Sequence, residues 1–247
     1  MKSPARTDEI QVLFSDWPEH ELLDSGNRRK LERFGPYRLI RSEPKAWWTP
    51  DLGDDEWRKA AAEHTDERGW QAAAGTPRQW QVRFDNCAFE LRLTGGSKHV
   101  GVFPEQSPHW RWIQSQARAE GRSLRVLSLF GYTGAATLMA AAAGGAVTHV
   151  DASRPAMSWA RRNQELSGLG GLPIRWILDD AFKFVKREVR RQQRYDALIL
   201  DPPSFGRGPA NEVWKVEQQL AELLADCRQL LAERARFVVL TLSLIHI

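Results

Sequence analysis

Cysteine is scarce in this sequence, and its scarcity excludes whole classes of protein. The 247 residues include 2 cysteines, Cys87 and Cys227, which lie far apart in the chain. They provide neither a disulfide framework nor the spacing of a zinc site, so we expect a reducing compartment. His99 and His109 have no companion at metal-ligand spacing either, and we interpret them as surface or hydrogen-bonded histidines. We therefore predict no bound metal.

Long apolar runs and a strong excess of one charge are also missing. The longest run of small apolar residues, 135–147, is shorter than the roughly 18 residues that a membrane-spanning helix needs. The first residues, Met1–Glu9, contain no apolar core of a secretion signal, so we expect no membrane contact and a cytoplasmic location. The formal net charge of +4 permits a polyanionic partner without requiring one.

Residues 124–139 have the pattern of a strand, a glycine turn and a helix. The apolar run from Leu124 to Phe130 is typical of a buried parallel strand, and the alanine-rich sequence after Gly134 favours a helix. Glycines let the backbone approach a ligand closely, and the start of a helix directs free N–H groups to the same place. This pattern predicts a nucleotide-type cofactor site. Because 131–136 lacks the G-x-G-x-x-G spacing, a nicotinamide enzyme is only a distant alternative.

Strands and helices alternate in the rest of the chain. Apolar segments predict strands at 146–151, 174–178, 195–201 and 236–240, with helices between them. This alternation indicates right-handed βαβ units, and so an α/β fold with a doubly wound parallel sheet. Ligands of such sheets bind beyond the carboxyl ends of the strands.

The region before the turn has a different pattern of apolar residues. Short apolar stretches at 10–14 and 37–40 are separated by glycines and prolines, which suggests short strands and loops. Segments 80–84 and 89–93 alternate apolar with polar residues around Asp85-Asn86, which predicts a β-hairpin. We therefore predict a small N-terminal β-rich domain, residues 1–95, followed by the α/β domain, residues 96–247.

Tryptophan and arginine are concentrated in the N-terminal region. Aromatic side chains interleaved with basic ones can stack on bases and follow phosphates. The alternative, which we favour, is that the tryptophans fill a small core while the arginines are solvated, because large aromatics dominate cores. The tryptophans concerned are Trp47, Trp48, Trp57, Trp70 and Trp80.

A second basic run, Lys183–Arg194, lies on the predicted helix after Asp180. Such a run of positive charges could bind nucleic acid. A helix packed on a sheet must also expose one side, and lysine and arginine are common there, so we favour a solvated helix face.

Acidic residues stand at three predicted carboxyl ends of the sheet. Asp151 ends the second strand, where it could accept hydrogen bonds from both hydroxyls of a ribose. Alternatively, it is a solvated strand end or the N-cap of the next helix. Asp179 and Asp180 follow the third strand. After the fourth come residues 201–205, Asp-Pro-Pro-Ser-Phe, in which the prolines fix the chain and the aromatic could stack on a planar ring. An ordinary turn with prolines is the alternative for this loop.

Together these motifs resemble class I S-adenosylmethionine-dependent methyltransferases, specifically the group related to bacterial large-subunit rRNA methyltransferases. The resemblance extends to upstream segments 23–26, 30–37 and 101–106, so it covers nearly the whole chain. It implies a Rossmann-like methyltransferase sheet and S-adenosylmethionine as cofactor. A full sheet of this family has two further strands, so the resemblance also implies that this chain is incomplete after its fifth strand.

The resemblance assigns roles to individual residues. It implies that Asp151 holds the ribose and that Asp180, with the amide of Ala181, contacts the adenine. Gln106 occupies a position like the family's cofactor contact before the sheet. The methionine part of the cofactor would contact Phe130, Gly131, Tyr132, Thr133 and Gly134. The methyl group and the acceptor would face Asp201, Pro202, Pro203 and Phe205.

The resemblance also bears on the acceptor atom. For a nitrogen acceptor, Asp201 and the Pro202 carbonyl could accept amine hydrogens while Phe205 stacks on the base. Methylation of cytosine carbon 5 requires a cysteine nucleophile, which in the family follows strand five, where this chain has Thr241-Leu242-Ser243. We therefore expect methyl transfer to a nitrogen of an RNA base, with rRNA as the expected partner. The alternatives are a small-molecule or protein methyltransferase, or a non-catalytic module that binds cofactor or RNA.

Overall fold

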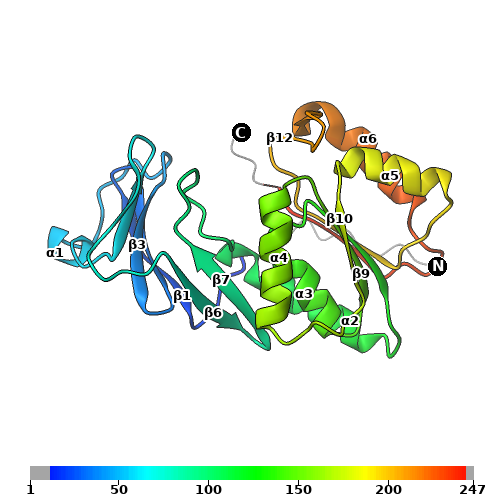
Figure 1. Cartoon of the computed structure of the whole chain (residues 1–247), viewed down its shortest axis with the longest axis horizontal. Helices are drawn as coiled ribbons and strands as arrows, with labels where there is room; N and C mark the ends of the chain where they lie inside the picture. Colours follow the sequence, from blue (N-terminus) through cyan, green and yellow to red (C-terminus); the bar gives the residue numbers. More distant parts are fainter. Residues whose placement is uncertain (1–11, 243–247) are drawn as a thin grey trace.

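The computed structural model describes residues 12–242 of the chain (Figure 1). The segment Met1–Glu9, residues 10 and 11 of the stretch 10–14, and Ser243 lie outside the described residues. Residues 12–14 have no regular secondary structure, so the short strand suggested there is absent from the described part. None of the helices in the described range is long and apolar enough to span a bilayer.

The N-terminal region is built from antiparallel strands. Its main sheet has 5 strands in chain order, antiparallel throughout except that β3 pairs with β4 in parallel. The strands are β1 (His20–Gly26), β2 (Arg29–Phe34), β3 (Tyr37–Ser42), β4 (Ala62–Thr65) and β5 (Gly69–Ala72), with the short helix α1 (Asp54–Trp57) between β3 and β4. The predicted hairpin is confirmed as β6 (Gln79–Phe84) and β7 (Cys87–Arg92).

The C-terminal region contains a parallel sheet of 5 strands in the order β10-β9-β8-β11-β14. Its strands are β8 (Arg125–Leu129), β9 (Ala146–Asp151), β10 (Ile174–Leu178), β11 (Ala197–Leu200) and β14 (Phe237–Leu240). From the central strand β8 the chain first adds β9 and β10 at one edge of the sheet, and it then returns to add β11 and β14 at the other edge. This order confirms the prediction of a doubly wound sheet. Such a reversal of strand order opens a ligand-binding crevice at the carboxyl ends of β8 and β11.

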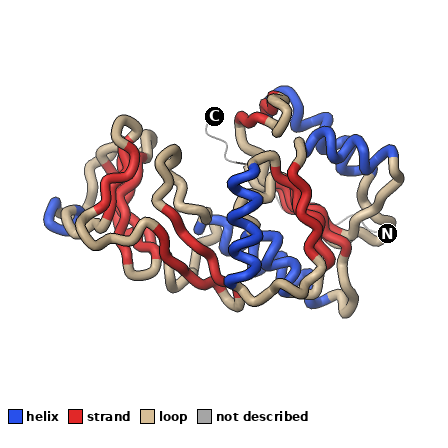
Figure 2. Tube along the Cα trace, viewed as in Figure 1, coloured by secondary structure: helices blue, strands red, loops and turns tan. Residues whose placement is uncertain are grey.

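Helices cover both faces of the parallel sheet, as Figures 1 and 2 show. On one face lie α2 (Ser107–Ala119), α3 (Ala135–Ala142) and α4 (Arg154–Leu166); on the other lie α5 (Ala181–Arg190) and α6 (Val216–Gln229). Side chains alternate along each strand, so Val126 and Ile199 belong to the core beneath α2 and α3, while Leu127 and Leu198 belong to the core beneath α5 and α6.

A small hairpin between β11 and α6 was missed by the sequence analysis. Its strands are β12 (Phe205–Arg207) and β13 (Val213–Lys215), which pair antiparallel. A single 3-10 turn, η1 (Pro104–Gln106), directly precedes α2. Strands of 3 residues are too short to produce a period-2 pattern in the sequence.

The hydrophobic core continues across the predicted domain boundary. Trp110 of α2 packs edge-on against Phe84 of the β6–β7 hairpin, with ring centroids 5.2 Å apart. The indole Nε1 of Trp159 on α4 donates to the Glu90 carbonyl at 2.8 Å, and Asn163 accepts a hydrogen bond from the Glu90 amide at 2.9 Å. The hairpin therefore packs on the α/β region, and a boundary between residues 95 and 96 stays a prediction.

The tryptophans of the N-terminal region divide between core and surface. Trp57 and Trp70 are buried and Trp80 is half-buried, which confirms for them the interpretation as core residues. Trp47 and Trp48 are 83% and 51% exposed, so that interpretation is wrong for this pair. They lie in the loop before α1, where the Trp48 indole donates to the Ser25 carbonyl at 2.8 Å.

Candidate active site

The turn after β8 has an unusual backbone. Phe130 and Tyr132 have φ angles of 55° and 49°, and Gly134, the N-cap of α3, has a φ of 86°. The turn is held by hydrogen bonds from the Gly131 amide to the Val150 carbonyl at 3.1 Å and from the Gly134 amide to the Gly131 carbonyl at 2.9 Å. Non-glycine residues in the left-handed region carry strain, and such strain is concentrated at functional sites.

A buried histidine explains why the turn needs a glycine at position 131. A Cβ atom there would lie 2.3 Å from Cε1 of His149, whose ring sits directly under the turn. His149 is fully buried; its Nδ1 shares a hydrogen bond of 2.9 Å with the Thr137 hydroxyl, and its ring packs against Trp176 at 4.7 Å. Close packing inside the protein thus requires this glycine, whatever ligand approaches from the other side.

His149 gives the stability of the protein a distinct pH dependence. Burial lowers the pKa of His149 to about 3, well below the 6.5 of a free histidine. Below about pH 6.5 the unfolded chain binds a proton that the folded chain does not, so stability falls as the pH falls towards 3. We expect the free energy of unfolding to drop by about 1.4 kcal/mol more per pH unit in the wild type than in His149→Gln between pH 6 and 4.

Urea denaturation of both proteins across this pH range measures that difference. His99, which is half-buried and whose pKa burial lowers to about 4, remains in both proteins, so its contribution cancels in the comparison. Equal slopes for the two proteins would contradict the assignment of a neutral His149.

Asp151, at the end of β9, holds the turn through its carboxylate. Oδ2 accepts a hydrogen bond from the Tyr132 amide and Oδ1 accepts one from the Ser153 amide, both at 2.8 Å. Desolvation raises the pKa of Asp151, while these two hydrogen bonds oppose the rise. Each oxygen keeps a further lone pair, which fits the two adjacent hydroxyls of a ribose. Because Ser153 is the N-cap of α4, the alternative of Asp151 as that helix cap is wrong.

Asp180 and Ala181 lie at the end of the neighbouring strand β10. Asp180 is the N-cap of α5, and its Oδ1 accepts a hydrogen bond from the Lys183 amide at 2.8 Å. Its own amide donates to Oδ1 of Asp179 at 2.9 Å. Both Asp180 and Ala181 are buried. Oδ1 of Asp180 is engaged in capping the helix, and the contact of Asp180 and Ala181 with adenine stays a prediction.

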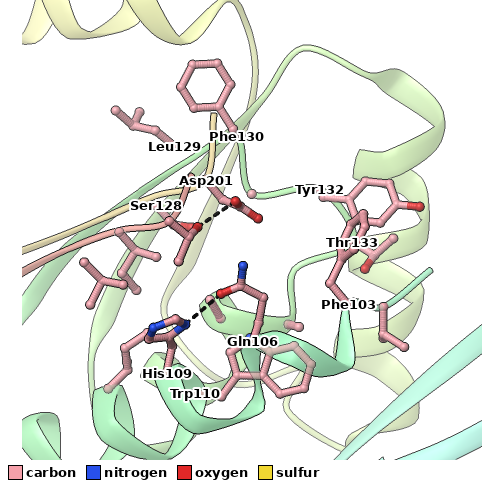
Figure 3. A pocket seen from close by; sticks show the side chains of 18 of the residues that line it. Phe103, Gln106, His109, Trp110, Ser128, Leu129, Phe130, Tyr132, Thr133 and Asp201 are labelled. Atoms are coloured by element: carbon pink, nitrogen blue, oxygen red, sulfur yellow. Dashed lines mark hydrogen bonds between the residues drawn. The ribbon is translucent and has the colours of Figure 1, made fainter. Parts of the chain in front are cut away.

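A pocket opens at the point where the strand order reverses (Figure 3). Of the residues predicted for the site, it brings together Gln106, Phe130, Gly131, Tyr132, Thr133 and Asp201. The other predicted residues lie outside its lining: Gly134, Asp151, Asp180, Ala181, Pro202, Pro203 and Phe205. The pocket thus joins the glycine turn to the loop after β11.

Asp201 is the acidic group of this pocket. Its Oδ1 accepts a hydrogen bond of 2.6 Å from the hydroxyl of Thr241, which follows β14. The carboxyl opens to solvent on one side, but the crowded pocket wall desolvates it and raises its pKa; the charge of Glu105 adds to the rise, and Thr241 and His109 oppose it. Asp201 is therefore fixed in place with a hydrogen-bond acceptor available to a ligand.

The start of α2 supplies a polar pair, Gln106 and His109, of which only Gln106 was predicted to belong to the site. Nδ1 of His109 and Oε1 of Gln106 lie 2.9 Å apart, and Figure 3 shows the Gln106 amide reaching towards Asp201. His109 is hydrogen-bonded, as predicted, but its place in the pocket was missed. Gln106, His109, Trp110 and Ile113 all line the pocket, and their helical spacing is the signal that could have identified them.

The loop after β11 is held by a tryptophan that the sequence analysis did not single out. Nε1 of Trp214 donates to the Pro203 carbonyl at 2.7 Å, and its ring lies 5.0 Å from that of Phe130. The Phe130 side chain accordingly points out of the pocket, as Figure 3 shows. Phe205 is on β12 and exposed, so the structure does not place its ring in the pocket.

Comparisons with known proteins agree with this geometry. A structure of an S-adenosylmethionine-dependent methyltransferase from Agrobacterium tumefaciens is 45% identical, covering 92% of this chain and 74% of that one, with a TM-score of 0.89. A methyltransferase complexed with S-adenosylhomocysteine is 20% identical with a TM-score of 0.71, covering 87% of this chain and 59% of that one, and shows the fold alone.

Among curated proteins, the ribosomal RNA large subunit methyltransferase K/L of Hahella chejuensis is 39% identical over 153 residues. The match covers 61% of this chain and 20% of that protein, so the chain spans about a fifth of this relative's length. A model of the S-adenosylmethionine-dependent methyltransferase family matches residues 64–237, well over half of the sequence. The chain therefore belongs to the family of S-adenosylmethionine-dependent methyltransferases.

Proposed function

We propose that this methyltransferase transfers the methyl group of S-adenosylmethionine to a nitrogen of an RNA base, with rRNA as the substrate. The observation that carries the proposal is the position of Asp201. Its carboxylate lies in one pocket with the glycine turn, at the reversal of strand order, and is held there by Thr241. The similarity to the ribosomal RNA large subunit methyltransferase K/L supports RNA as the acceptor class. An rRNA substrate agrees with a cytoplasmic location.

The residues in and beside the pocket suit the positioning that this reaction needs. The sulfonium methyl group of the cofactor is already electrophilic, so the protein has to hold the acceptor close and aligned. Asp151 would bind the ribose, and the turn around Gly131 would contact the methionine part. Asp201 would accept a hydrogen bond from the amine of the acceptor and orient its lone pair towards the methyl group.

A nitrogen acceptor is favoured because no thiol is available in the pocket. Both cysteines are buried elsewhere: Cys87 in the β6–β7 hairpin and Cys227 in the core beneath α6. Burial raises the pKa of the Cys87 thiol to about 11 and that of Cys227 to about 12. Neither thiol is ionised at neutral pH, and so neither can act as the nucleophile that carbon methylation of a pyrimidine requires.

The test is methyl transfer from S-adenosylmethionine carrying a labelled methyl group to separate fractions of total RNA, protein and small metabolites. We expect the label in RNA, where it survives protease and is released by nuclease as a nucleoside methylated on nitrogen. Asp201→Asn keeps the shape of the side chain but removes its charge, and serves as the control for labelling by other enzymes. Label in protein or metabolites instead would support the alternative substrates, and no label in any fraction would support a non-catalytic module.

A further inference from the structure

The outer face of the β12–β13 hairpin combines apolar and basic side chains. In its antiparallel register Phe205 pairs with Lys215 and Arg207 pairs with Val213, while Gly206 pairs with Trp214. Residues paired directly across strands share a face, and successive residues alternate between faces. Since Trp214 is buried on the inner face, the outer face consists of Phe205, Arg207, Val213 and Lys215. Figure 1 shows the hairpin at the end of the sheet where α6 begins.

The hairpin is firmly attached to the loop that carries Asp201. Trp214 donates to the Pro203 carbonyl at 2.7 Å, and the Val216 amide donates to the Ser204 carbonyl at 3.0 Å. At the tip, the Glu212 carboxylate accepts a hydrogen bond from the Ala210 amide at 2.8 Å and pairs with Lys183 of α5 at 2.6 Å. The outer face therefore has a fixed position beside the pocket.

The side chains of this outer face have no partners within the part of the chain that the structure describes. Phe205 is 53% exposed and Val213 is 45% exposed. The charged groups of Arg207 and Lys215, both exposed, make no ion pair or hydrogen bond among residues 12–242. The face thus presents an aromatic ring and two uncompensated positive charges, with no acidic side chain among its four residues.

The basic run on α5 is different, although it contains more positive charges. Most of its members are neutralised locally, which supports the interpretation of a solvated helix face. The pairs are Lys183 with Glu212, Lys186 with Glu222, Arg187 with Asp179, and Arg191 with Glu188. A polyanion that binds α5 would have to displace these carboxylates, whereas the outer face of the hairpin, Phe205, Arg207, Val213 and Lys215, carries none.

We propose that the outer face of the β12–β13 hairpin binds the single-stranded RNA segment next to the acceptor nucleotide. Phe205 stacks on a base, since aromatic rings bind bases of any sequence, and Arg207 and Lys215 contact the adjacent phosphates. Phosphate contacts fix the register of the strand, so the hairpin presents the acceptor to the pocket beside Asp201. The proposal rests on RNA as the substrate of the proposed function.

The test compares two double charge reversals that change the net charge equally. Arg207→Glu with Lys215→Glu alters the hairpin. Arg190→Glu with Arg234→Glu alters exposed positions before β11 and β14, at the other end of the sheet. We expect the affinity for a single-stranded fragment of rRNA to fall at least about tenfold in the hairpin variant and less than about threefold in the control variant.

The salt dependence and a third variant separate phosphate contacts from stacking. Loss of two phosphate contacts lowers the slope of log affinity against log salt by about 1 to 2. Phe205→Ala weakens RNA binding by about fivefold or more and leaves that slope unchanged. S-adenosylhomocysteine binds all variants as it binds the wild type, which also verifies that they are folded.

Three outcomes would overturn the proposal. In the first, the wild type methylates RNA and the hairpin variant binds RNA equally well, so that only the hairpin assignment fails. In the second, both double variants lose affinity equally, which means that net charge and not this face determines binding. In the third, the wild type neither binds nor methylates RNA while it methylates protein, so that the proposed function fails together with the hairpin assignment.

Discussion

We expect Asp201→Ala to lower the rate of methyl transfer by about 100-fold or more and to change the affinity for S-adenosylhomocysteine by less than about twofold. The carboxylate stands in the pocket with the glycine turn and accepts a hydrogen bond from Thr241 at 2.6 Å. In the proposed reaction it contacts the acceptor amine and not the cofactor. A positioned hydrogen-bond acceptor or general base contributes about 10²–10⁴-fold to a rate.

Single-turnover transfer of a labelled methyl group measures the rate, and calorimetry measures the affinity for S-adenosylhomocysteine. Thr241→Val is a matched control, because it removes the hydroxyl that orients Asp201 but keeps the carboxylate; we expect a smaller loss, about tenfold. An Asp201→Ala protein that turns over at the rate of the wild type would remove Asp201 from the reaction.

The second large effect concerns cofactor binding. We expect Asp151→Ala to weaken the binding of S-adenosylhomocysteine by at least about 100-fold. The variant loses the charge-assisted hydrogen bonds to two ribose hydroxyls, each worth about 1.5–3 kcal/mol, and also the anchor of the Tyr132 amide. Calorimetric titration gives the affinity directly, and circular dichroism verifies that the variant is folded.

Two variants bracket this result. Asp151→Asn keeps one acceptor oxygen without the charge, so its affinity lies between those of the wild type and of Asp151→Ala. Ser153→Ala removes the cap of α4 and leaves the Asp151 carboxylate in place, so we expect it to lower stability by about 1 kcal/mol and affinity very little. An affinity that is the same in Asp151→Ala and the wild type would contradict the assignment of the ribose site.

The parallel sheet was predictable because its strands leave a local signature. Buried parallel strands are covered on both faces, so they appear as continuous apolar runs, and the strands predicted at 146–151 and 174–178 coincide with β9 and β10. The carboxyl ends of parallel strands meet at one edge of the sheet, so residues that are far apart in the sequence come together there. For this reason Asp201 and Gly131 were predicted to share a site, and both line the pocket.

What the sequence did not reveal depends on contacts between distant residues. Gly131 is required by the His149 ring, which no local pattern indicates. The outward direction of Phe205 is set by the pairing of β12 with β13, because the inward position opposite Gly206 belongs to Trp214. Trp47 and Trp48 lie in the same tryptophan-rich stretch of the sequence as the buried tryptophans. The composition of that stretch therefore could not separate the exposed pair from the core residues.

The identity of the cofactor follows from the family, whereas its contacts in this chain are our assignment. A crystal structure of the protein with S-adenosylhomocysteine bound tests that assignment most directly. We predict the ribose hydroxyls on the Asp151 carboxylate, the adenine beside Asp180, and the sulfur atom in the pocket that Asp201 and Gln106 line. A cofactor bound away from Asp151, or with its sulfur outside that pocket, would contradict the account.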